Sequence, residues 1–127
     1  MKRLISPLAA ALLVFLLGTA LAATVSHFDA VPQRDHARQN PLAGDPKAIA
    51  AGAILYHDHC EKCHQAGAQG DGKKKPSLRT SSVNGATDGD LEWFLRQGDI
   101  RHAMPPWSNL PQAQRWQLID YLRSLQR

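Results

Sequence analysis

The residues with the most distinctive chemistry form the run Cys60-Glu61-Lys62-Cys63-His64. Two thiols separated by two residues and followed at once by an imidazole are typical of c-type haem attachment. The thiols can reach the two vinyl groups on one edge of a porphyrin, while the adjacent imidazole points at the iron. The motif therefore predicts one covalent haem c, with Cys60 and Cys63 as the thioether donors and His64 as an axial iron ligand.

Two other chemistries are compatible with these residues. A Cys-x-x-Cys pair in an exported protein can form a redox-active disulfide, although no βαβ pattern surrounds this pair. A zinc site is also possible, because His57 and His59 bring the number of potential ligands within eight residues to five. No second ligand pair follows at zinc-finger spacing, and the chain has no other cysteine. We expect His57 and His59 to be solvated helix residues.

An iron bound by His64 needs a partner on the opposite side of the porphyrin. Met104 is the only methionine besides the initiator, and it lies in a loop that Pro105 and Pro106 stiffen. A thioether ligand raises the reduction potential and suits an electron carrier. His102 is the competing ligand, and bis-histidine ligation would lower the potential. The alternative role of Met104 is to fill a gap in the core.

The N-terminus has the pattern of an export signal. Two basic residues precede an apolar run over residues 8–17, and small residues end at Ala22. We predict a signal peptide over residues 1–22, with Ala23 as the alternative cleavage position, and therefore a periplasmic protein. The alternative is an uncleaved segment that anchors the protein in the inner membrane, because residues 4–23 reach the roughly 20 residues that a membrane helix needs.

Composition limits the classes of partner. Removing the signal leaves 105 of the 127 residues and takes away two positive charges, so the net charge falls from +4 to +2. A mildly basic domain lacks the strong basic face of a nucleic-acid-binding protein. A domain of this size gains much of its stability from a bound cofactor. Residues 23–44 are polar and irregular and are predicted to form an N-terminal extension or linker, which leaves residues 45–127 for one domain.

Capping patterns predict the first two helices. Asp45 followed by proline indicates a helix start, and the helix is expected to run over residues 46–59, directly before the first cysteine. Thr87 and Asp90 have the spacing of a capping box at the start of a second helix. Gly98 is a natural end for that helix.

A third helix is predicted to open at Pro111 and to present one broad apolar face, which contains Leu118, Ile119, Tyr121, Leu122 and Leu125. Residues 65–86 and 99–110 have loop composition, rich in glycine, proline, serine and lysine. No strand pattern and no internal repeat are present. The pattern therefore indicates an all-α fold.

Glycine, aromatic and cysteine recur at four-residue intervals before the attachment motif, as Gly52, Tyr56 and Cys60. With these residues, the segment 44–127 resembles a class I c-type cytochrome of the small, exported, bacterial, single-haem kind. The resemblance implies a cytochrome c fold, with about three main helices wrapped around one haem c. It also implies that the first and last helices cross at Gly52, beside Tyr121.

The same resemblance implies roles for residues in the loop after the motif. Pro76, twelve residues after His64, would offer its carbonyl to the Nδ1–H of that histidine, and Leu78 would lie against the haem. Two positions depart from the family pattern, because Gln65 and Lys75 stand where glycine is usual. The departures concern the course of the loop and not the ligation.

The implied function is that of a one-electron carrier, not an enzyme, with His64 and Met104 as the axial ligands of its iron. Such a carrier shuttles electrons between an exported dehydrogenase and a respiratory acceptor, and a quinoprotein dehydrogenase or a terminal oxidase is the expected kind of partner. The alternative is a haem enzyme or a gas-binding protein with a labile distal ligand. Lys62 and the run of residues 73–75 are candidates for docking an acidic partner.

Overall fold

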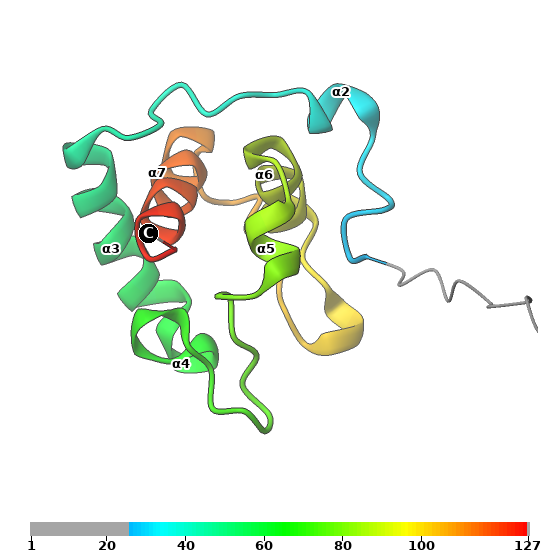
Figure 1. Ribbon diagram of the computed structural model, residues 1–127, viewed down its shortest axis with the longest axis vertical. Coiled ribbons are helices and arrows are strands. Elements are labelled where there is room, and N and C mark those ends of the chain that lie inside the picture. The colour runs from blue at the N-terminus through cyan, green and yellow to red at the C-terminus, as the bar shows by residue number, and fades with distance from the viewer. Residues whose placement is uncertain (1–25, 127) are drawn as a thin grey trace, which may run out of the picture.

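A computed structural model describes residues 26–126, whose regular elements are all helical (Figure 1). The predicted signal peptide and both of its cleavage positions, after Ala22 or Ala23, lie outside the described residues. None of the helices within residues 26–126 has the length and apolar character needed to cross a membrane. The elements are α2 (Gln33–His36), α3 (Pro46–His59), α4 (Glu61–His64), η1 (Ala66–Ala68), α5 (Ser81–Gly85), α6 (Asp88–Gln97), η2 (Ile100–His102) and α7 (Gln112–Ser124).

The predicted helix starts are confirmed. At α3, Asp45 Oδ1 accepts a hydrogen bond from the Lys47 N–H at 2.8 Å. At α6 the capping box is complete, because Thr87 Oγ1 accepts from the Asp90 N–H at 3.1 Å and Asp90 Oδ2 accepts from the Thr87 N–H at 2.8 Å. The last helix follows Pro111 directly. These caps satisfy N–H groups that would otherwise lack a partner at the start of a helix.

The segment 65–86, predicted as a loop, contains the short helices η1 and α5. Helix α5 begins because the Thr80 side chain accepts a hydrogen bond from the Val83 N–H at 3.2 Å. A threonine cap favours one helical turn even in a stretch of serine and glycine. The three long helices are nevertheless the ones that the sequence predicts.

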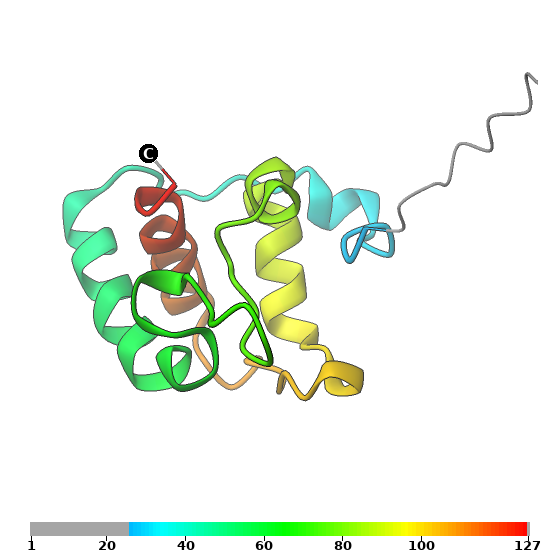
Figure 2. The same ribbon diagram turned by 60° about the horizontal axis from the view of Figure 1, so that its bottom comes forward.

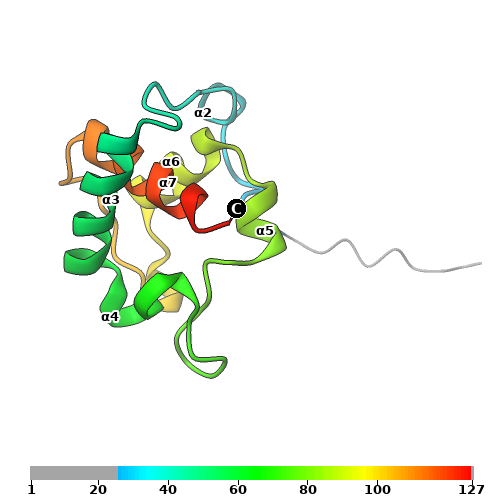
Figure 3. The same ribbon diagram turned by 60° about the vertical axis from the view of Figure 1, so that its left-hand side comes forward.

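Helices α3 and α7 cross in direct backbone contact, as predicted from the family pattern (Figures 1 and 3). A Cβ atom built on Gly52 would lie 2.0 Å from the Gln117 carbonyl oxygen and 2.9 Å from the Tyr121 Cβ. Beside the crossing, the Tyr56 and Tyr121 rings pack with centroids 5.3 Å apart. Glycine is therefore required here because no side chain fits between the two helices.

Replacing Gly52 with valine is expected to lower the free energy of unfolding by about 3 kcal/mol, the upper end of the usual range for overpacking. The reason is that the clash involves backbone, which cannot rotate away. The measurement is chemical unfolding of the haem-loaded protein. Ala50→Val is the matched control. Ala50 is exposed on α3, so valine there introduces the same β-branched side chain without a clash. Equal unfolding midpoints for the two variants would show that the helices do not cross at Gly52.

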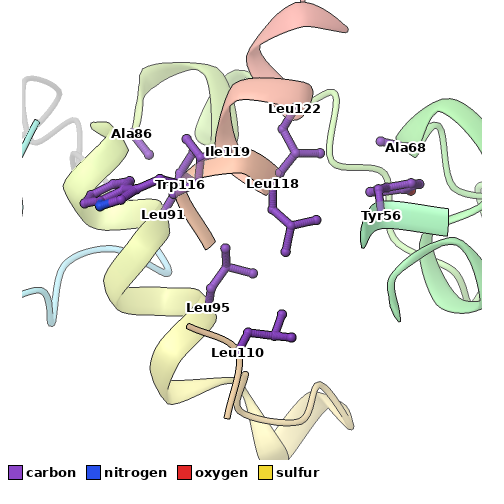
Figure 4. Packing of buried hydrophobic residues seen from close by; sticks show 10 residues of the cluster. All are labelled: Tyr56, Ala68, Ala86, Leu91, Leu95, Leu110, Trp116, Leu118, Ile119 and Leu122. Atoms are coloured by element: carbon purple, nitrogen blue, oxygen red, sulfur yellow. The ribbon is translucent and has the colours of Figure 1, made fainter. Parts of the chain in front are cut away.

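The core lies between the inner faces of α6 and α7 and extends toward α3 (Figure 4). In this close-up, Leu95, Leu110 and Leu118 point toward one another from α6, the loop before α7, and α7 itself. The ten buried members are Tyr56, Ala68, Ala86, Leu91, Leu95, Leu110, Trp116, Leu118, Ile119 and Leu122. Half-buried apolar groups, including Cys60, Leu78 and Met104, pack against this cluster.

Residues 26–44, which we call the strap, pass over α6 and α7 before α3 begins (Figures 1 and 3). The strap contains α2 and is bonded to the domain. Asn40 Nδ2 donates to the Trp116 carbonyl at 3.1 Å, and the Gly44 N–H donates to Asp120 Oδ1 at 2.9 Å. The segment therefore packs against the helical domain over much of its length.

Candidate haem attachment site

The residues of the attachment motif lie on one turn at the junction of α3 and α4. The Cys60 N–H donates to the Tyr56 carbonyl at 2.8 Å, which ends α3, and the Cys60 carbonyl accepts from the His64 N–H at 2.9 Å, which forms α4. Both thiols are free. Cys60 is half-buried against the core, whereas Cys63 is exposed. The backbone of this turn thus holds the two thiols and the imidazole within one short stretch of helix.

The Cys60 thiol does not have the lowered pKa that is typical of a redox-active cysteine. Burial, with a smaller contribution from the charge on Cys63, raises the pKa of the Cys60 thiol to about 11. Burial has this effect because it removes the water that would stabilise a thiolate. Reactive cysteines have lowered pKa values instead. Within residues 26–126, no three His, Cys, Asp or Glu side chains are grouped to hold a metal ion, so the zinc alternative gains no support.

The orientation of His64 is fixed by the loop that follows it. Its Nδ1 lies 2.9 Å from the Pro76 carbonyl oxygen. A carbonyl can only accept, so Nδ1 carries the proton and Nε2 is left with a free lone pair for a metal. This is the contact that the family pattern implies. Nearby, the Leu78 N–H donates to the Ala68 carbonyl at 2.9 Å, and the leucine side chain is half-buried against the core.

Gln65, which stands where the family pattern has glycine, has a backbone conformation that favours glycine. Its φ is +65° and its ψ is 163°, a region that side chains other than glycine rarely enter. The Tyr56 hydroxyl donates to the Gln65 carbonyl at 2.7 Å and so holds the turn. Burial raises the pKa of Tyr56 well above its ordinary value, which keeps this hydroxyl protonated. Gln65 thus adopts a backbone conformation that favours glycine, and the Tyr56 hydroxyl bonds its carbonyl.

Met104 is half-buried and packs against the core, in a loop fixed on both sides. Its N–H donates to the Asp99 carbonyl and its carbonyl accepts from the Asp99 N–H, each at 2.9 Å. Beyond the methionine, the Trp107 N–H donates to the Leu95 carbonyl at 2.8 Å. The Trp107 ring lies 5.1 Å from that of His59, so this loop runs from α6 back to the attachment end of α3 (Figure 2).

The competing ligand, His102, is turned away from the core. Its Nδ1 lies 2.6 Å from Asp99 Oδ2, and its side chain is 71% exposed. The hydrogen bond from His102 holds the pKa of Asp99 below its usual range. His57 and His59 are also exposed, as the sequence predicts. Of the side chains considered as a second axial ligand, only Met104 is directed at the core.

One residue near the site was not predicted from the sequence. Asp71 Oδ1 accepts hydrogen bonds from the N–H groups of Lys73, Lys74 and Lys75 at 2.9, 3.0 and 2.9 Å. These bonds lower the pKa of Asp71, with the Lys75 amide contributing most. Aspartate followed by glycine is a known turn signal and could have revealed the arrangement. The lysine run is thus an ordered turn.

Haem c fits this arrangement. Two free thiols share a turn with an imidazole whose Nε2 is available. Cys60 packs against the core cluster in which Leu95, Leu110 and Leu118 converge. Met104 adds a thioether on the edge of the same core. Soft sulfur and imidazole donors in apolar surroundings are the ligands of a low-spin haem iron in an electron-transfer protein.

Comparison with known proteins agrees with this geometry. The sequence family described as cytochrome c oxidase, cbb3-type, subunit III matches residues 47–122. The match covers more than half of the chain and includes the attachment motif, Met104 and most of α7. No curated protein and no solved structure matches the chain. With its all-α fold and its Cys-x-x-Cys-His turn, the chain belongs to this family of c-type cytochrome domains, which bind haem c.

Proposed function

We propose that this protein is a one-electron carrier whose haem is joined by thioether bonds to Cys60 and Cys63 and ligated by His64 and Met104. The observation that carries the proposal is the hydrogen bond from His64 Nδ1 to the Pro76 carbonyl, which presents Nε2 to the site. A bound haem c supplies a reversible one-electron couple at its iron. The chain's own part is to fix the two ligands and to exclude water with the apolar faces of α6 and α7.

The ordered loop around Met104 favours a carrier over a haem enzyme or a gas-binding protein. A loop bonded at Asp99 and at Trp107 restrains the thioether, and a firmly held ligand leaves no place for peroxide or carbon monoxide. The test is a redox titration of the purified holoprotein with and without carbon monoxide. We expect a single reversible one-electron transition and a ferrous spectrum unaffected by the gas. Rapid gas binding would favour the alternative.

We propose further that residues 1–22 export the chain to the periplasm, where it exchanges electrons with an exported dehydrogenase and a terminal oxidase. The family description, a subunit of a cytochrome c oxidase, supports a terminal oxidase as one partner. Export also agrees with the attachment chemistry, because c-type haem is attached outside the cytoplasm. An uncleaved N-terminal segment would instead tether the same domain to the inner membrane.

The turn closed by Asp71 is suited to docking an acidic partner. Lys73 and Lys74 are exposed, and the aspartate holds their backbone in one conformation close to Pro76. Charges presented from an ordered turn attract a partner over long range at little entropic cost. Screening shortens that range from about 30 Å at 0.01 M salt to about 10 Å at 0.1 M.

Changing Lys73 and Lys74 to glutamine is expected to slow electron transfer to oxidase-containing membranes severalfold at low salt, and to flatten its salt dependence. The haem spectrum should not change. The measurement is the oxidation rate of the ferrous protein from low to high ionic strength. Arg34→Gln with Lys47→Gln removes two exposed positive charges elsewhere and serves as the control. If both double variants behave alike, the lysine turn has no special role in docking.

A further inference from the structure

The proposed electron-carrier site leaves one buried charged group unexplained. Glu92 on α6 is completely buried, with 0% of its side chain exposed. Arg115 of α7 donates from Nε to its Oε1 at 2.8 Å, and the Arg115 Nη2 forms an ion pair with the same oxygen at 2.8 Å. Arg38 of the strap donates to its Oε2 from Nη1 at 2.7 Å. Removing either guanidinium group destabilises a carboxylate buried in this way, because each partner offsets part of its desolvation cost.

Arg115 connects this carboxylate to the loop that carries Met104. Its Nη1 donates to the Leu110 carbonyl, and it also lies 3.5 Å from the Trp107 carbonyl. These two carbonyls belong to the part of the loop between Met104 and α7. The position of the Arg115 guanidinium, set by Glu92, therefore determines where that part of the loop lies.

The strap also reaches the other end of the same loop. The His27 ring packs edge-on against Phe94, with centroids 6.4 Å apart, and against His102, with centroids 5.9 Å apart. Its Nδ1 lies 3.9 Å from Asp99 Oδ2. Asp99 is the residue whose backbone pairs with Met104. The strap thus contacts one boundary of the Met104 loop directly, through His27, and reaches the other boundary through Glu92 and Arg115.

The strap is held against α6 by its own contacts. Asp35 accepts from Arg96 Nη2 at 2.7 Å, and His36 Nδ1 lies 2.9 Å from Asp90 Oδ1. The approach is close, since a Cβ atom on Gly89 would lie 2.0 Å from the Asp35 carbonyl oxygen. The strap lies before the segment 47–122 that matches the family, whereas its partners on α6 and α7 lie within it.

We propose that the strap is a positioning element for the distal-ligand loop, in which Arg38 acts through Glu92 and Arg115 to fix how firmly Met104 is held. The proposal rests on Met104 as an iron ligand, as proposed above. Without Arg38, Glu92 Oε2 loses its shortest ion pair, and the next guanidinium, that of Arg96, lies 3.7 Å away. The Arg115 guanidinium then shifts toward the Glu92 carboxylate. It thereby loses its hydrogen bonds to the carbonyls of Trp107 and Leu110.

The chain contains a matched control for this network. Arg123 is also on α7, donates from Nε to a carboxylate of α6, Asp88, at 2.8 Å, and donates to the backbone carbonyls of Val83, Asn84 and Ala86. Like Arg115, Arg123 thus joins a carboxylate of α6 to backbone carbonyls. The carbonyls that Arg123 binds, however, belong to the segment before α6 and not to the Met104 loop. Loosening this pair lowers stability without releasing the Met104 loop.

The experiment measures the carbon monoxide association rate and the reduction potential of the haem-loaded protein. In Arg38→Gln we expect the association rate to rise between about twofold and about thirtyfold, the range typical of residues that act on a site through packed neighbours. The potential should fall toward that of Met104→Ala. Arg38→Lys should recover part of the wild-type behaviour, and Arg123→Gln should leave both readouts unchanged. His27→Ala removes an exposed ring and tests the other contact without opening the core.

The outcomes separate this inference from the proposed function. A wild-type protein that binds carbon monoxide as fast as Met104→Ala overturns the ligation, and the role of the strap with it. A slow wild type with unchanged Arg38→Gln and His27→Ala variants overturns the role of the strap alone. Equal increases in Arg38→Gln and Arg123→Gln also overturn it, because they reveal general loosening.

Discussion

Replacing both Cys60 and Cys63 with alanine is expected to abolish covalent haem attachment. Co-expressed with a haem maturation system, the wild-type chain should keep its haem mass under denaturing mass spectrometry, and the double variant should have the mass of the polypeptide alone. The double variant should also lose its stable fold. A domain of about 100 residues forms only a modest core and depends on the covalently bound haem for additional stability. This is the largest effect that we expect from any substitution in the chain.

The control for this result is a variant that lacks His57 and His59, the two histidines just before the attachment motif. His57→Ala with His59→Ala should retain the full haem content, because both imidazoles are exposed and neither is assigned a role in attachment. Loss of metal in the histidine variant, or unmodified thiols in the wild-type protein, would contradict the haem assignment. The single cysteine variants should each keep one thioether bond.

The second large effect concerns the distal ligand. Met104→His should keep a six-coordinate iron and lower the reduction potential by a few tenths of a volt, within the ~0.8 V range over which axial ligands set haem potentials. Met104→Ala should open the iron to carbon monoxide. Potentiometric titration and gas-binding spectra measure the two changes. The half-buried position of Met104 against the core is the reason for both expectations.

His102→Ala is the control for the ligand assignment. Its imidazole is bonded to Asp99 and is mostly exposed, so its removal should shift the potential far less than Met104→Ala does. A large shift in the potential of His102→Ala, together with a small shift in Met104→Ala, would reverse the two roles. The pair of variants therefore decides which residue of this loop is the ligand.

Sequence predicted the features of this fold that local chemistry specifies. The cap at Asp45, the capping box of Thr87 and Asp90, and the close helix contact at Gly52 all depend on residues a few positions apart or on the family pattern. The buried charge of Glu92 was not predictable in the same way, because its partners are 23 and 54 residues away. From the pattern of polar and apolar residues along a helix, a glutamate is predicted to face solvent.

Gln65 is a second case in which a contact outside the local sequence decides the structure. The sequence departs from glycine there, and the departure brings the course of the loop into question. The structure retains the glycine-like backbone because the Tyr56 hydroxyl, nine residues away, holds the Gln65 carbonyl. A tertiary contact thus compensates for an unfavourable local preference, which costs about 1–3 kcal/mol.

The crossing of α3 and α7 also determines the order in which the chain can fold. Gly52 and Gln117 touch although 65 residues separate them, so the contact forms only after a long loop has closed. Until α7 has been synthesised, α3 lacks the helix that crosses it at Gly52, and Cys60 lacks part of the core that half-buries it in the finished domain. Cys60 is therefore most accessible in the incomplete chain, before the last helix completes the core against which this cysteine packs, whereas Cys63 stays exposed.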